Sequence, residues 1–294
     1  MITYVVGDLF QSPARVLVNA VNTVGVMGKG VAEEFKRCYP EMFAQYQQLC
    51  QDEQFTVGQL WLYKTPHKWI LNFPTKAHWR DPSLLPYIEA GLQKFAENYA
   101  DKGITSISFP LLGCGAGGLD WEEQVRPLME YYLAPLPINA YIHLYEPSNP
   151  FAPAQRDFEA IRAWLNQEPE TTTFAQFWDA LTRLILQKNA FQTVGMKADF
   201  QAIFDADERR ITITPAHGES VAVSESLLSE VWHYVRAAGY TLPHNLPGDI
   251  DAPYLVALLS ELPYFRPVLL AEVDDVAQRR IGLQYVARVS EVVV

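Results

Sequence analysis

Cysteine is scarce in this sequence. The 294 residues include three cysteines, Cys38, Cys50 and Cys114, and six histidines. Three cysteines supply no disulfide framework, and none of them stands near another cysteine or a histidine at the spacing of a metal site. We therefore expect a protein of the reduced cytoplasm that needs neither a metal nor any other cofactor.

Long hydrophobic runs are also absent. No stretch approaches the ~18 consecutive apolar residues that a membrane-spanning helix needs. The first residues are typical of a strand, with Asp8 close behind them, and this pattern is unlike a secretion signal. The sequence therefore predicts neither export nor a membrane partner.

Basic residues are outnumbered by acidic ones, 23 to 34, and the net charge is −11. Residues 1–150 contribute 11 − 15 = −4, and residues 151–294 contribute 12 − 19 = −7. A general DNA-binding protein normally presents a basic face, so this class is excluded. A local contact with one modified nucleotide remains compatible with the charge, and the acidic second half suits a basic partner.

What the sequence does contain is enough apolar material for real cores, at 49% hydrophobic residues, and a length typical of two domains. Strand-like and helix-like runs alternate in the first half, which predicts an α/β fold with a central mixed sheet and helices on both faces. Expected strands are 3–6, 16–21, 59–64, 68–73, 105–110 and 138–145. Expected helices are 29–38, 41–50, 84–102 and 121–133, the last capped by Asp120.

A proline-rich stretch at 146–153 ends this pattern. We expect a first domain over 1–155, a helix and linker over 156–171, and a smaller α+β domain over 172–294. The second domain shows no catalytic motif, and its histidines are interpreted as structural. Its expected helices are 173–189, 224–238 and 252–262, and its expected strands are 202–205, 210–214, 268–273 and 281–288.

Two glycine loops follow buried strands in the first domain. The first glycine loop, residues 25–31, lies between a strand and a helix, and the second glycine loop, residues 113–118, follows the strand at 105–110. Such loops present backbone N–H groups, and the first also meets the positive end of a helix dipole, so both can hold a diphosphate. Ligands of α/β sheets bind at the carboxyl ends of the strands, where both loops lie. A plain strand–helix turn is the alternative for either loop alone.

Four sequence phrases resemble the macrodomain family, which binds ADP-ribose. They are Val-Gly-Asp-Leu at 6–9, the loop at 19–32, Asn-Phe-Pro-Thr-Lys-Ala-His-Trp-Arg at 72–80 and the loop at 112–118. They are most similar to the branch that holds the DarG-type antitoxins and the human terminal ADP-ribose glycohydrolase, and the resemblance covers roughly residues 1–150. It implies an ADP-ribosyl glycohydrolase that hydrolyses an N-glycosyl bond without metal and releases ADP-ribose from thymidine in DNA. It also implies a protein partner, the DarT toxin, bound by the second domain.

The resemblance places the ADP-ribose site on identifiable residues. Asp8 would accept a hydrogen bond from the adenine amino group, Tyr145 would stack on adenine, and Asn22 would hold ribose hydroxyls and assist catalysis. The alternatives are a capping aspartate, a core tyrosine and an Asx turn. The expected ligand-binding residues are Asp8, Leu9, Asn22, Gly28, Lys29, Gly30, Val31, Gly113, Cys114, Gly115, Ala116, Gly117, Gly118 and Tyr145.

Lys76 falls on the position of the catalytic lysine in this branch. Its amine would attack carbon 1 of the distal ribose, provided that burial or nearby cations favour the neutral amine. The cations close to it in the sequence are Lys64, His67, Lys68, His78 and Arg80. A solvated loop lysine is the alternative that residues alone would favour.

His78, Trp79 and Arg80 are candidate DNA contacts, because an exposed tryptophan beside cations can stack on a base. Core packing is the alternative for Trp79. The human relative has an aspartate where this chain has Gly117, so a lysine–aspartate pair does not carry over and the group that activates water is unassigned.

Two other functions stay open at this point. One is a reader that binds ADP-ribose without hydrolysis, and the other is a hydrolase of ADP-ribosylated protein carboxylates. Acidic residues in turn-like stretches of the second domain are candidate toxin contacts: Asp205, Asp207, Glu208, Asp249 and Asp251.

Overall fold

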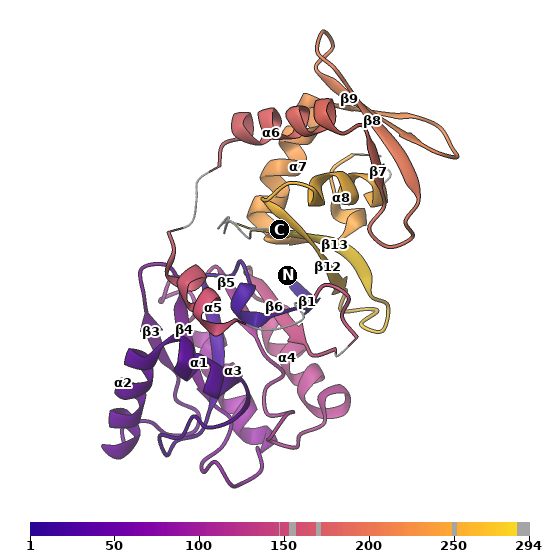
Figure 1. The fold of residues 1–294 in the computed structure, drawn as a ribbon. Helices are drawn as coiled ribbons and strands as arrows, with labels where there is room; N and C mark the ends of the chain where they lie inside the picture. Colours follow the sequence, from indigo (N-terminus) through magenta and orange to yellow (C-terminus); the bar gives the residue numbers. More distant parts are fainter. Residues whose placement is uncertain (147, 153–156, 169–171, 249–251, 287–294) are drawn as a thin grey trace. The chain divides into compact units, whose positions relative to one another are not determined.

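The computed structural model describes residues 1–146, 148–152, 157–168, 172–248 and 252–286 (Figure 1). The chain divides into two compact units. Unit 1 comprises residues 1–168 and 272–276, and unit 2 comprises 169–271 and 277–294. The predicted limits at 153–156 and 169–171 lie outside the described residues, so the predicted domain boundaries stay a prediction.

Unit 1 is built on a mixed sheet, as the sequence predicts. Five strands run parallel, and β3 alone in this unit's sheet is antiparallel to its neighbour β4. The carboxyl ends of the parallel strands therefore share one edge. In spatial order the strands are β1 (Ile2–Val6), β6 (Asn139–Leu144), β5 (Ser106–Phe109), β2 (Val16–Val21), β4 (Trp69–Pro74) and β3 (Trp61–Lys64).

Helices cover both faces of this sheet, which confirms the predicted layering. On one face Leu17 and Ile70 share a buried cluster with residues of α1 (Gly30–Cys38), α2 (Pro40–Gln51) and the 3-10 helix η1 (Leu9–Gln11). On the other face the Phe73 ring fills the space above Gly91, where an added Cβ would lie 2.2 Å from it. The helices of that face are α3 (Leu85–Asn98), the π-helical turn η2 (Trp121–Val125) and α4 (Arg126–Leu133).

Two local predictions of unit 1 can be checked directly. Asp120 caps η2, because its side chain accepts a hydrogen bond from the backbone N–H of Glu123 at 2.7 Å. The helix that follows the first proline-rich stretch is α5 (Phe158–Asn166). It buries Ile161 and Leu165 in the same cluster as α1 and α2, so this helix packs on the sheet-covering layer of unit 1.

Unit 2 has its own core of helices and antiparallel strands. Phe177 of α6 and Trp232 of α7 stack with ring centroids 4.6 Å apart. The predicted helices are present as α6 (Phe174–Gln187), α7 (Glu225–Ala238) and α8 (Ala252–Ser260). The strands form the pairs of β10 (Val221–Ser224), β9 (Arg210–Pro215), β8 (Asp199–Asp205) and β7 (Ala190–Gln192), and of β11 (Tyr240–Thr241), β13 (Arg280–Tyr285) and β12 (Phe265–Ala271).

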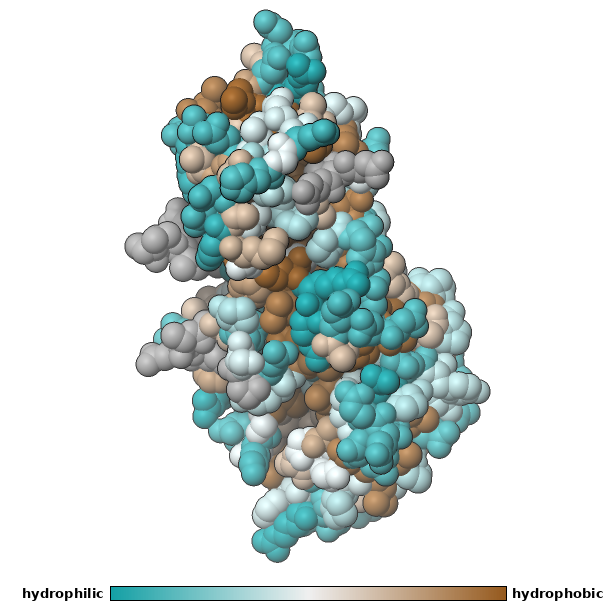
Figure 2. All heavy atoms as spheres, turned by 90° about the vertical axis from the view of Figure 1, so that its right-hand side faces the viewer, coloured by the Kyte–Doolittle hydropathy of each residue, from teal (hydrophilic) through white to brown (hydrophobic). Residues whose placement is uncertain are grey.

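Hydrophilic side chains cover much of the face of the molecule drawn in Figure 2. Among the described residues, no helix is both long and apolar enough to cross a bilayer. No group of three or more His, Cys, Asp or Glu side chains in the described part of the chain is placed to hold a metal ion.

Candidate functional site

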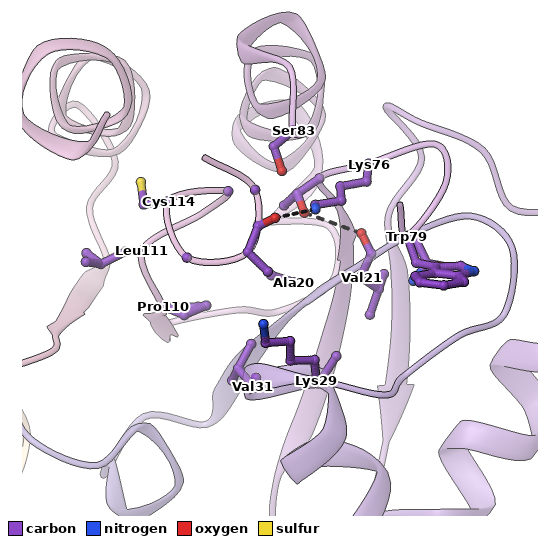
Figure 3. A pocket seen from close by; sticks show the side chains of 18 of the residues that line it. Ala20, Val21, Lys29, Val31, Lys76, Trp79, Ser83, Pro110, Leu111 and Cys114 are labelled. Carbon is purple, nitrogen blue, oxygen red and sulfur yellow. Dashed lines mark hydrogen bonds between the residues drawn. The ribbon is translucent and has the colours of Figure 1, made fainter. Parts of the chain in front are cut away.

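A cavity of about 830 Å³ opens at the edge where the parallel strands of unit 1 end (Figure 3). Asn22 follows β2, Lys76 follows β4, Pro110 follows β5 and Tyr145 follows β6, and all four line the cavity. The topology thus gathers residues from four separate stretches of sequence around one space, as the carboxyl ends of parallel strands do in open α/β sheets.

Most of the residues predicted to bind the ligand lie in this cavity. The lining includes Asn22, Gly28, Lys29, Gly30, Val31, Lys76, Trp79, Gly113, Cys114, Gly115, Ala116, Gly117 and Tyr145. The described lining does not include Asp8, Leu9, Gly118, His78 or Arg80. Sequence reasoning missed Ala20, Val21, Val26, Ala32, Thr75, Ser83, Pro110, Leu111 and His143. The roles of individual residues in binding stay predictions.

Asn22 shapes the first glycine loop. Its Oδ1 accepts hydrogen bonds from the backbone N–H of Val24 at 3.0 Å and from the Tyr46 hydroxyl at 3.1 Å. Its Nδ2 donates to the carbonyl oxygen of Val26 at 2.5 Å. The Asx-type turn that was the alternative reading is therefore present. A further contact of the same amide with ribose stays a prediction.

The loop then enters α1 at the cavity wall. Gly30 has φ +63°, a value that favours glycine, and Lys29 stands at the N-cap position with no side-chain cap. The free N–H groups of the first helical turn and the Lys29 ammonium form an electropositive wall. Figure 3 shows Lys29 and Lys76 entering the cavity from opposite sides.

The second glycine loop is tied to the loop between β4 and α3. The Lys76 Nζ donates to the carbonyl oxygen of Ala116 at 2.6 Å, and the Ser83 backbone N–H donates to the carbonyl oxygen of Gly117 at 2.9 Å. A Cβ at Gly117 would lie 2.1 Å from the Gly113 oxygen, so only glycine fits there. Burial, and secondarily the charge of Asp120, raise the pKa of the Cys114 thiol to about 11. This thiol therefore stays protonated near neutral pH.

The predicted cationic surroundings of Lys76 are partly wrong. Lys64 pairs with Trp69 at the beginning of β4, and Lys68 donates its buried Nζ to the Ser12 carbonyl oxygen at 2.7 Å. Lys76 comes after the far end of the same strand, roughly 20 Å away at about 3.3 Å per residue. Lys64, His67 and Lys68 therefore belong to the opposite edge of the sheet. They are near Lys76 in sequence but do not face the cavity.

Trp79 and Tyr145 are surface residues, so the core alternative is wrong for both. Trp79 is 46% exposed and Tyr145 is 85% exposed. The His78 ring stacks beside Trp79 with centroids 5.5 Å apart, and the Arg80 guanidinium lies 4.6 Å from the Trp79 ring centroid. Asp8 caps η1 by accepting from the Phe10 N–H at 3.0 Å, which is the capping role that was its alternative.

His143 lies at the floor of the cavity and is fully enclosed by protein. Its Nδ1 is 3.1 Å from the Gly7 carbonyl oxygen and its Nε2 is 3.3 Å from the Ser108 hydroxyl. Burial lowers the pKa of His143 to about 4, against the opposing effects of the Gly7 carbonyl and the Asp8 charge. The imidazole is therefore neutral at physiological pH.

This pKa predicts a loss of stability in mild acid. The folded pKa of His143, about 4, is below its ordinary value of 6.5, so the unfolded chain binds the proton first as the pH falls. The cost begins below pH 6.5 and reaches about 3 kcal/mol near pH 4. Urea titrations at pH 7 and pH 5 should show that His143→Gln loses about 2 kcal/mol less than the wild type across this interval. Equal losses in the two chains would contradict a buried neutral imidazole.

The Macro domain family model matches residues 18–128. A DNA ADP-ribosyl glycohydrolase of Mycobacterium tuberculosis is 45% identical over 152 residues, which are 50% of this chain and 43% of that protein. A "DNA ADP-ribosyl transferase-DNA ADP-ribosyl glycohydrolase fusion protein" of Thermosipho africanus is 39% identical over 162 residues, 49% of this chain and 42% of the fusion.

The ADP-ribose glycohydrolase OARD1 of Bos taurus is 30% identical over 134 residues, which are 45% of this chain and 85% of that protein. The chain thus spans less than half the length of the two bacterial relatives and most of the bovine one.

Proposed function

The chain belongs to the macrodomain family, and on that premise we propose that its cavity binds ADP-ribose and hydrolyses the N-glycosyl bond between ADP-ribose and thymidine in DNA. The observation that carries the proposal is the position of Lys76. Its amine lies between two glycine loops on the wall of a cavity of about 830 Å³, within the range of about 300–1,000 Å³ that is typical of small-molecule sites.

The two loops suit the diphosphate of ADP-ribose. The first turn of α1 offers N–H groups and the positive end of the helix dipole, and Lys29 adds a cation on the same wall. The second loop lies on the opposite wall. With the diphosphate held between the loops, the distal ribose extends toward the Lys76 side.

In the proposed reaction the neutral Lys76 amine attacks carbon 1 of the distal ribose. The new carbon–nitrogen bond replaces the bond to the base, whose electron pair leaves with the base nitrogen and is protonated there. Water then displaces the amine from carbon 1 and regenerates it. The Ala116 carbonyl that holds Nζ at 2.6 Å orients the amine before the substrate arrives.

Trp79 favours a nucleobase as the leaving group. It lines the cavity three residues after Lys76, is 46% exposed, and is flanked by the His78 ring and the Arg80 guanidinium. A flat aromatic surface beside cations can stack on a base and attract the neighbouring phosphates. The names of the M. tuberculosis and T. africanus relatives, which specify DNA, support the same substrate.

For unit 2 we propose a binding role toward a DarT-type transferase. The fused transferase and glycohydrolase of T. africanus support a functional pairing of the two activities. The charge of −7 over residues 151–294 suits a partner with a basic DNA-binding face. Asp205 holds the β8–β9 turn by accepting from the Glu208 N–H, and Asp207 is exposed there. The candidates Asp249 and Asp251 lie outside the described residues.

Calorimetric titration with ADP-ribose in the presence of a chelator tests the binding step. We expect micromolar affinity, roughly −8 kcal/mol. Parallel incubations with DNA ADP-ribosylated on thymidine and with protein ADP-ribosylated on glutamate test the reaction. Release from the DNA alone is expected. Binding without release from either substrate would indicate a reader, and release from the protein alone would indicate a carboxylate hydrolase.

A further inference from the structure

Ser83 is a cavity residue that neither the sequence motifs nor the proposed mechanism uses. It precedes α3, and its backbone N–H donates to the Gly117 carbonyl oxygen at 2.9 Å. The side chain is 3% exposed and lies against the second glycine loop. In Figure 3 it stands on the same side of that loop as Lys76.

The Ser83 hydroxyl has no hydrogen-bond partner among the described residues. Several other buried polar atoms share this state, but Ser83 Oγ is the one among them that belongs to the cavity lining. A buried hydroxyl without a partner costs free energy, and such groups in native proteins usually have a reason. A ligand that brings its own hydrogen-bonding group into the cavity would satisfy it.

The surroundings of Oγ indicate which part of a ligand fits. Built at Gly117, a Cβ would lie 2.1 Å from the Gly113 oxygen and 2.3 Å from Ser83 Oγ. These two oxygens therefore lie close together, and the Ala116 oxygen is held by Lys76 next along the loop. Carbonyl oxygens repel a phosphate but accept hydrogen bonds from a hydroxyl.

We propose that the Ser83 hydroxyl is a ligand-binding group that hydrogen-bonds a hydroxyl of the distal ribose, the ribose that Lys76 faces. This inference rests on the proposed function. Ser83 holds the sugar by its hydroxyls while Lys76 meets carbon 1. A serine oxygen can donate to and accept from a sugar hydroxyl in turn.

The experiment compares Ser83→Ala with wild type in calorimetric titrations against ADP-ribose and against ADP, which lacks the distal ribose. Because one neutral hydrogen bond is lost, the affinity for ADP-ribose should fall about five- to tenfold, and the affinity for ADP should not change. The melting temperature of the free protein should not fall, because the hydroxyl has no partner to lose.

Ser106→Ala is the matched control. Ser106 Oγ accepts from the Arg15 N–H at 2.9 Å, at the beginning of β5 and away from the cavity. This variant should lower the melting temperature and leave both affinities unchanged.

Each other outcome decides against the assignment. An unchanged ADP-ribose affinity in Ser83→Ala removes Ser83 from the site. Parallel losses for ADP-ribose and ADP place its contact on the phosphates or the loop. A lower melting temperature with both affinities reduced makes the residue structural. If the wild type itself fails to bind ADP-ribose, the proposed function is wrong and the Ser83 assignment is wrong with it.

Discussion

Replacing Lys76 by alanine should slow the release of ADP-ribose from thymidine DNA by about a thousandfold or more, since the removed group is the nucleophile. Binding of ADP-ribose should stay within about threefold of wild type, because a nucleophile contributes mainly to the transition state. In the free protein the Nζ makes one described hydrogen bond, to the Ala116 oxygen. Single-turnover assays and calorimetry on the same preparation measure the two quantities.

Lys76→Arg separates nucleophilic from electrostatic roles. Arginine keeps the positive charge but stays protonated, so it cannot supply a free electron pair. It should be as inactive as Lys76→Ala. Near-normal turnover by either variant would rule out the lysine mechanism, and loss of ADP-ribose binding together with activity would make Lys76 a ligand contact. Lys64→Ala, at the opposite edge of the sheet, is the control and should retain activity.

The full-length Lys76→Ala protein should still capture a tagged, catalytically inactive DarT-type toxin and should still protect cells, at least in part. In this proposal neutralisation depends on unit 2 and not on the cavity. Charge reversal at exposed Asp207 should weaken capture, and capture should weaken as salt screens exposed charge pairs. Asp101→Lys, an equally exposed change in unit 1, should leave capture unchanged. Co-purification at low and high salt measures each effect.

Failure of the full chain to capture the toxin would contradict binding by sequestration and leave protection to the enzyme. Capture that survives removal of residues 169–294 would place the partner site on unit 1. Capture that is insensitive to both Asp207→Lys and salt would keep the partner but remove the role of the β8–β9 turn and of acidic charge.

Periodic apolar patterns and glycine positions were enough to predict the sheet of unit 1, its helices on both faces and the two loops at the strand ends. The α-helices of unit 2 were also predicted. Its three shortest strands, β7, β10 and β11, were missed, because two to four residues carry no measurable alternation.

The site itself was harder to predict, since side chains meet there across the fold. Proximity in sequence misled for Lys68, because a full strand separates it from Lys76 and carries it to the other edge. His143 and Ser83 carry no local signal. His143 reads as one more residue of a buried strand, and Ser83 reads as an ordinary loop serine. Only the packing of the β4–α3 loop on the second glycine loop brings Ser83 to the cavity.

The contact between Gly117 and Ser83 has an evolutionary consequence. Any side chain at position 117 would collide with the Gly113 oxygen and with Ser83 Oγ, so the two positions cannot change independently. Descendants of this chain that keep its loop conformation are confined to glycine at 117 for as long as position 83 holds a serine. A lineage that gains a carboxylate at 117 must rebuild the β4–α3 loop in the same step. Positions 83 and 117 should therefore covary among homologues, and that covariation would mark where one branch of hydrolases separates from another.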